Sequence, residues 1–103
     1  AIRVPTPNVS LVDFKFNTKK NITIDNLNNK FQEYANSSLK GILGVDTDPK
    51  VSSDYNHDAR SSILDLTETT TVSDNFGRVL TWYDNEWGFS NRMLETTAQV
   101  CNL

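Results

Sequence analysis

The N-terminal segment places an arginine where it could bind an anion. Arg3 lies in the sequence AIRVPTP, and Pro5 and Pro7 restrict the backbone beside it to extended conformations. A guanidinium held in this way can make two parallel hydrogen bonds to a phosphate or a carboxylate. A surface arginine that binds nothing fits the same pattern, so both interpretations of Arg3 stay open.

A second candidate is the aromatic segment WYDNEWGFSNR, residues 82–92. Its Trp, Tyr and Phe side chains surround Asn85 at the junction between an expected strand and an expected helix. The first backbone N–H groups of a helix are free to bind a ligand, and the aromatic walls would suit a flat heteroaromatic one. An ordinary corner of the core explains the same composition equally well.

The sequence contains no other pattern typical of a catalytic or metal site. The four glycines form neither a G-x-G-x-x-G motif nor a P-loop. We expect no metal site, because His57 and Cys101 are far apart and each is the only residue of its type. Cys101 falls on an apolar helix face, which favours a structural thiol over a nucleophile. We therefore assign no catalytic residue in this chain.

Composition narrows the function classes further. A net charge of −3 offers no basic patch for nucleic acid. No apolar stretch approaches the roughly 18 residues of a membrane span. A single cysteine cannot form an internal disulfide, which favours a cytoplasmic protein. The 103 residues fit at most one domain, and the chain begins at Ala1 with its only methionine at Met93, so we expect either a processed product or a piece of a longer protein.

Hydrophobic periodicity predicts an α+β fold, a mostly antiparallel sheet with helices packed on one face. The predicted strands cover 8–16, 42–45, 51–57, 61–72 and 78–83, and the predicted helices cover 24–38 and 87–101. A phase switch between Leu11 and Val12 indicates either a β-bulge or a strand buried on both faces.

Capping residues mark the predicted helix ends. Thr23 can cap the first helix, Gly41 can adopt a left-handed conformation after it, and Asp84 or Asn85 can cap the second. The second helix is expected to bury one apolar face, made of Phe89, Met93, Leu94, Thr97 and Cys101.

The longest motifs resemble a known enzyme family. In order and spacing, four motifs resemble the C-terminal part of the phosphorylating glyceraldehyde-3-phosphate dehydrogenases: WYDNEWGFSNR, AIRVPTPNVSLVD, LKGILG and VSSDYNHD. The resemblance spans essentially the whole chain. It implies a cytosolic, NAD-dependent homotetramer whose Rossmann domain and catalytic Cys and His lie outside these residues. Residues 1–103 would then be a single partial catalytic domain, inactive when isolated, of an enzyme that oxidises an aldose phosphate.

The resemblance also implies roles for particular residues. Arg3 matches the arginine that helps to bind the substrate phosphate. Asn85 matches the asparagine that contacts the nicotinamide carboxamide, and Phe89 occupies the family's position beside the nicotinamide ring. Tyr83 matches an aromatic position near the catalytic cysteine. His57 and Cys101 match neither catalytic motif.

Two branches of the family compete for this sequence, and we expect it to belong to the erythrose-4-phosphate dehydrogenase branch. Phe89 stands where glyceraldehyde-3-phosphate dehydrogenases usually have Tyr, and with His57 and the run NRMLETT it favours the erythrose-4-phosphate dehydrogenase branch, which serves pyridoxal phosphate synthesis. Tyr83, Pro7 and RSS at 60–62 favour the alternative, glycolytic glyceraldehyde-3-phosphate dehydrogenase. A stand-alone interaction module is a remote alternative. Since a partial domain exposes apolar surface, we expect the isolated chain to self-associate.

Overall fold

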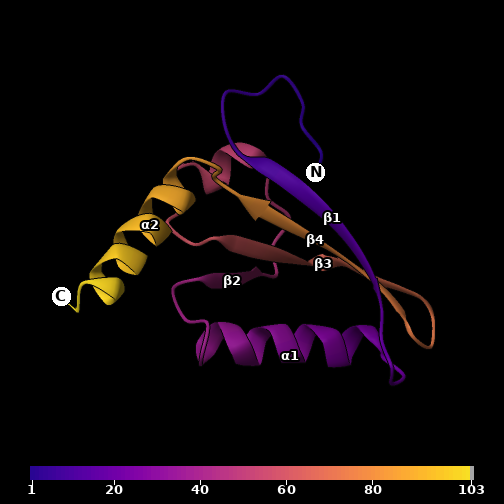
Figure 1. Cartoon of the computed structure of the whole chain (residues 1–103). Helices are drawn as coiled ribbons and strands as arrows, with labels where there is room; N and C mark the ends of the chain where they lie inside the picture. The colour runs from indigo at the N-terminus through magenta and orange to yellow at the C-terminus, as the bar shows by residue number, and fades with distance from the viewer. Residues whose placement is uncertain (103) are drawn as a thin grey trace.

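The computed structural model describes residues 1–102 and has an α+β fold, as the sequence predicts. The chain runs strand, helix, strand, short 3-10 helix, strand, strand and helix (Figure 1). The elements are β1 (Ser10–Asn17), α1 (Ile24–Asn36), β2 (Leu43–Asp46), the 3-10 helix η1 (Ser52–Tyr55), β3 (Ser62–Ser73), β4 (Phe76–Tyr83) and α2 (Trp87–Val100).

The strands of residues 1–102 form one sheet in the order β1-β4-β3-β2. The pairs β1–β4 and β4–β3 are antiparallel and β2–β3 is parallel, so the sheet is mixed. In the β1–β4 register Ser10 lies opposite Tyr83. The start of β1 and the end of β4 therefore lie at the same end of the sheet, and so do the segments that precede and follow them.

One face of the sheet packs against α1. Leu64, Leu66 and Val79 are buried there against partly buried side chains, among them Phe31 of α1 and Val45. Complete burial of an aliphatic side chain of this size stabilises a fold by about 1.5–3 kcal/mol. The start of α1 is fixed by the predicted cap, because the Thr23 hydroxyl accepts the Asn26 N–H at 3.2 Å.

A second cluster lies on the other face, since neighbouring strand residues point to opposite sides. Val9, Tyr55 and Ile63 are buried in it, and Trp82 packs against them. The Tyr55 and Trp82 rings stack with centroids 5.5 Å apart. This cluster anchors η1 beneath the end of the sheet that holds the start of β1.

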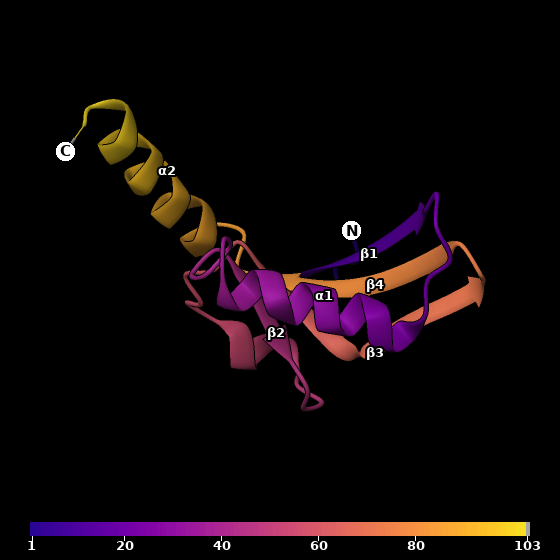
Figure 2. The ribbon, with the colours of Figure 1, turned by 90° about the horizontal axis from the view of Figure 1, so that it is seen from below.

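Helix α2 differs from its prediction. It extends away from the sheet, as Figures 1 and 2 show from two directions. Phe89, Met93 and Leu94 are 65%, 54% and 69% exposed, and Cys101 is exposed, so the expected buried face and the packing role of Cys101 are both wrong. Periodicity identifies side chains that share a face, but it does not establish that another element covers that face.

Three local features also bear on the predictions. Residues 51–57 do not form a strand; Ser52–Tyr55 is a 3-10 helix whose start is tied by the Asp54 carboxylate, which accepts the Val51 N–H at 2.8 Å. Gly41 has the predicted left-handed φ of 81°. The register of β1 is continuous, so the phase switch reflects partial burial on both faces, and the register shifts lie in β3.

Candidate functional site

The N-terminal segment that carries Arg3 folds back on β1. The Ile2 N–H donates to the Leu11 carbonyl at 2.6 Å, and the Leu11 N–H donates back to the Ile2 carbonyl at 3.3 Å. Val9 completes the reversal with a φ of 72°, a region that β-branched residues rarely adopt. Arg3 is exposed and lies directly after this bridge, so its guanidinium is accessible to a ligand.

The turn between β4 and α2 carries the other predicted residues. Tyr83 ends β4, Asp84 and Asn85 follow, and Phe89 lies in the first turns of α2. The residue directly before α2 is Glu86, whose side chain makes no capping bond, and neither predicted cap occupies that position. The Asp84 carboxylate nevertheless accepts the Trp87 N–H at 2.9 Å, so Asp84 holds the start of the helix. Asn85 is left free of that task. Its side chain is half-buried, and its amide makes a long hydrogen bond of 3.3 Å to the Glu86 carboxylate.

Asp84 is the most buried charged group at this end of the sheet, at 2% exposure. Its carboxylate also accepts the His57 N–H at 2.9 Å and the Asn8 side-chain amide at 2.7 Å. Burial raises the pKa of the Asp84 carboxyl, but the hydrogen bonds from Trp87, His57 and Asn8 outweigh it, so the pKa lies below its ordinary value. Asp84 is therefore an ionised anchor within the protein.

Two hollows meet at Asn85. The first has a volume of about 170 Å³ and is lined by Arg3, Asn8, Asn85 and Glu86 with other residues of segment 4–10. The second has a volume of about 300 Å³, and its lining residues are Ser61, Tyr83, Asp84, Asn85, Gly88, Phe89 and Arg92. The structure thus brings the predicted residues Arg3 and Asn85 to one hollow, and Tyr83, Asn85 and Phe89 to the other.

The sequence prediction missed several residues at this site. Arg92 lines the second hollow and holds α2 against two loops, with hydrogen bonds of 3.4 Å and 3.3 Å to the carbonyls of Gly41 and Ala59. Ser61, the residue before β3, lines the same hollow. Asn8 and the anchoring role of Asp84 were also missed. Since Asn8 and Asp84 are 76 positions apart, no local pattern reveals their contact.

Other candidate groups lie apart from the hollows. The His57 ring lies against the Trp87 ring, with centroids 4.8 Å apart, and it lines neither hollow. Cys101 follows the last residue of α2, about 20 Å along the helix axis from its start. Among residues 1–102, no group of three His, Cys, Asp or Glu side chains is placed to hold a metal ion. Within the same residues, no helix has the length and apolar character needed to span a membrane.

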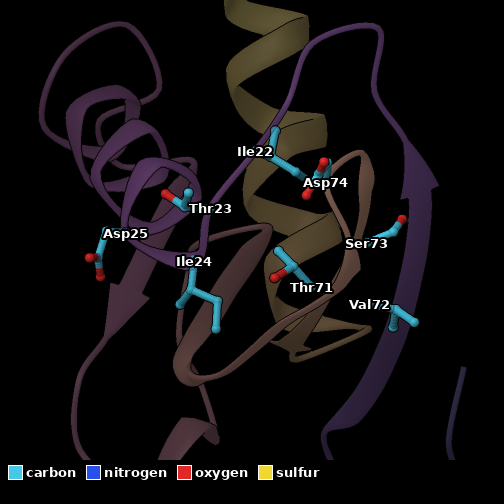
Figure 3. Close-up of a pocket in the computed structure, with 8 residues that line it drawn as sticks. All are labelled: Ile22, Thr23, Ile24, Asp25, Thr71, Val72, Ser73 and Asp74. Atoms are coloured by element: carbon cyan, nitrogen blue, oxygen red, sulfur yellow. The ribbon is translucent and has the colours of Figure 1, made fainter.

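A larger hollow lies at the opposite end of the sheet, with a volume of about 600 Å³ (Figure 3). It separates the start of α1 from the β3–β4 hairpin, and its lining residues are Ile22, Thr23, Ile24, Asp25, Thr71, Val72, Ser73 and Asp74. It holds hydroxyl and carboxylate groups but no nucleophile paired with a base. The smaller hollows at Asn85 are the better candidate site, because they combine a guanidinium, an amide and aromatic walls.

Comparisons with known proteins identify relatives of this chain. The family model for the C-terminal domain of glyceraldehyde 3-phosphate dehydrogenase matches residues 1–85, which include Arg3, Tyr83 and Asn85. The chain is 47% identical over 103 residues to a protein of Cereibacter sphaeroides named glyceraldehyde-3-phosphate dehydrogenase. A protein of the same name from Xanthobacter flavus is also 47% identical over 103 residues, and one from Ajellomyces capsulatus is 42% identical over 102.

The alignments cover nearly all of this chain but only part of each relative. The first two alignments cover 100% of this chain and 31% of each relative, and the third covers 99% and 30%. The chain therefore spans about three tenths of the length of the curated relatives that it matches.

Proposed function

Because the chain belongs to the glyceraldehyde-3-phosphate dehydrogenase family, as a part of its C-terminal domain, we propose that it forms one side of the active site of an NAD-dependent aldose-phosphate dehydrogenase. The observation that carries the proposal is the hollow that Arg3 and Asn85 share. Its lining offers both a cationic fork and a neutral amide. The names of the three relatives support glyceraldehyde 3-phosphate as the substrate.

Arg3 binds the substrate phosphate in this proposal. Its side chain is exposed beside the hollow, so binding does not require an existing ion pair to break. A well-formed hydrogen bond between charged partners contributes about 1.5–3 kcal/mol. The planar guanidinium can also orient the phosphate by two parallel hydrogen bonds, which a lysine cannot do.

Asn85 and its aromatic neighbours fit a nicotinamide ring. The Asn85 side chain has both a donor and an acceptor, as a carboxamide partner needs. Tyr83 and Phe89 line the adjoining hollow of about 300 Å³, where Phe89 would lie beside the ring and Tyr83 near the reacting carbon. NAD, when bound, would supply the hydride acceptor. The amide of Asn85 would fix which face of the ring meets the substrate.

The rest of the catalytic machinery is proposed to lie in the part of the protein outside this chain. Cys101 is exposed beyond the end of α2, remote from both hollows, so we do not assign it as the nucleophile. The nucleophilic cysteine, its histidine base and the dinucleotide-binding domain would come from the remaining seven tenths of a protein as long as the relatives. We propose that the full-length protein is a homotetramer.

Erythrose 4-phosphate is a second candidate substrate. It rests on Phe89, which stands where the family usually has Tyr, and on the hollow in which Phe89 lies. The names of the relatives favour glyceraldehyde 3-phosphate instead. The test below therefore compares erythrose 4-phosphate with glyceraldehyde 3-phosphate.

The test is the rate of NAD reduction by the full-length protein with each aldose phosphate, with and without inorganic phosphate. We expect a higher kcat/KM for glyceraldehyde 3-phosphate, because that ratio measures discrimination between substrates. A higher value for erythrose 4-phosphate would assign the protein to the second candidate. An absence of NAD reduction with both substrates would refute the proposed activity.

A further inference from the structure

The hydrogen bonds of Asp84 exceed what a helix cap requires. One carboxylate oxygen, Oδ1, accepts the Trp87 N–H at 2.9 Å and so caps α2. The other, Oδ2, accepts the His57 N–H at 2.9 Å and the Asn8 amide at 2.7 Å. Neither bond to Oδ2 satisfies a backbone group of α2. Asp84 therefore connects the turn of Asn85 to two segments that are remote in sequence.

Asn8 is the link on the side of Arg3. It is half-buried, and its side-chain amide donates to Asp84 and also to the side-chain oxygen Oδ1 of Asn56 at 2.7 Å. It lies between Pro7 and Val9, whose φ of 72° is a rare conformation for a valine. Such a conformation persists only where surrounding contacts hold it. The bonds of Asn8 are contacts of this kind.

We propose that Asn8 and Asp84 are positioning residues, whose hydrogen bond fixes the separation between Arg3 and Asn85 across the hollow that these two residues line. This inference rests on the proposed function, in which Arg3 binds the substrate phosphate and Asn85 binds the nicotinamide. The separation of the two residues then sets the distance between the phosphate and the nicotinamide ring. Asn8 and Asp84 act through Arg3 and Asn85. A misplacement of about 1 Å at such a site can lower the rate about 100-fold.

The first test substitutes Asn8 in the full-length protein. Asn8→Ala removes the link, and we expect KM for the aldose phosphate and KM for NAD to rise together, with kcat/KM lowered by about 10- to 100-fold. The matched control is Asn28→Ala. Asn28 is also a half-buried asparagine, and its amide joins α1 to the Leu66 carbonyl at 3.1 Å, away from the hollows.

The control separates positioning from stability. We expect Asn28→Ala to lower Tm while both KM values stay at the wild-type level. If Asn8→Ala also lowered Tm and left both KM values unchanged, the bond would be purely structural and the inference would be overturned.

The second test reverses donor and acceptor. Asn8→Asp places a carboxylate against Asp84, so no donor remains between them and we expect a larger rise in KM than with Asn8→Ala. Adding Asp84→Asn restores one donor and should recover part of the lost kcat/KM. The recovery is partial, because the amide that replaces Oδ2 cannot accept the His57 N–H. Two defects that simply add would overturn the inference.

A third measurement tests the inference without relying on enzyme activity. If the wild-type protein reduced no NAD with either aldose phosphate, the proposed function would fail, and amide hydrogen exchange would still test the link. We expect Asn8→Ala to speed exchange in residues 1–9 and in residues 84–88 together. Faster exchange in residues 1–9 alone would show that the two segments are not coupled and would overturn the inference.

Discussion

Asp84 and Asn85 are adjacent in sequence and have opposite environments. The Asp84 side chain is 2% exposed and bonded within the protein, whereas Asn85 is half-buried and lines both hollows. Because Asp84 caps α2, the amide of Asn85 remains available to a ligand. Substitution of Asp84 should therefore change mainly stability, and substitution of Asn85 should change mainly ligand binding.

Asn85→Ala should weaken NAD binding with little change in stability. The substitution removes an amide whose hydrogen bond within the protein is the long one to Glu86, so Tm should stay near the wild-type value. The loss of an amide hydrogen bond to the cofactor should raise KM for NAD by about 5- to 15-fold, equivalent to about 1–1.5 kcal/mol. Steady-state kinetics of the full-length protein measure both KM values, and Asn26→Ala on the exposed side of α1 is the control. An unchanged KM for NAD would remove Asn85 from the cofactor site.

Arg3 should determine the affinity for the substrate phosphate. Arg3→Ala should lower kcat/KM for the aldose phosphate by about 10- to 150-fold, since a hydrogen bond between charged partners contributes about 1.5–3 kcal/mol. Arg3→Lys should restore part of the loss, because it keeps the charge but not the fork. KM for NAD should change little. The control is Lys20→Ala, which removes an exposed positive charge outside the hollows. An equal loss of kcat/KM in that variant would show that Arg3 acts only through the overall charge of the protein.

The sequence predicts the secondary-structure elements better than it predicts the contacts between them. Apart from residues 51–57, where a 3-10 helix replaces the predicted strand, the strands and helices follow from local periodicity, and Thr23 and Gly41 act as their residue types indicate. The exposure of α2 could not be predicted, because a helical stripe does not specify its partner. The contact between Asn8 and Asp84 also could not be predicted, because it depends on the β1–β4 register that brings two distant segments to one end of the sheet.

Phe89→Tyr should shift the preference between the two candidate substrates. Phe89 is 65% exposed, so an added hydroxyl needs no rearrangement of the core. If this position discriminates between the branches of the family, the ratio of kcat/KM for glyceraldehyde 3-phosphate over erythrose 4-phosphate should rise by about 10-fold or less. Phe14→Tyr is the control, because Phe14 is 55% exposed on β1 and lines neither hollow. A ratio that does not move would show that Phe89 has no part in the choice of substrate.

The isolated chain of residues 1–103 should self-associate. The apolar side chains of α2, including Met93 at 54% and Leu94 at 69% exposure, face water in this structure. Apolar surface of this kind favours association. Leu94→Lys should lower the apparent molecular mass in light scattering toward that of a monomer, whereas Thr96→Lys on the same helix should have a smaller effect. A monomer at high concentration for the unsubstituted chain would contradict this expectation.

The hydrogen bonds of Asp84 should make stability depend on pH in a defined direction. Burial raises the pKa of its carboxyl, but the N–H donors outweigh this and hold the pKa of the folded state below the ordinary value of 3.8. The ionised carboxylate therefore stabilises the fold above about pH 4, and this contribution is lost as the pH falls through the lowered pKa. Asp84→Asn should cost about 1–3 kcal/mol of unfolding free energy at pH 7, because it leaves buried donors without a full acceptor.

The measurement is denaturant unfolding of wild type, Asp84→Asn and Asn85→Ala between pH 2 and pH 8. Other carboxyls titrate in all three proteins, including Asp58, whose hydrogen bonds to Arg60 also hold its pKa below the ordinary value. Those contributions cancel in the differences from wild type. We expect the difference for Asp84→Asn to shrink below about pH 4. The difference for Asn85→Ala should stay constant, since it changes no titratable group. A difference for Asp84→Asn that is independent of pH would show that the charge of Asp84 does not stabilise the turn.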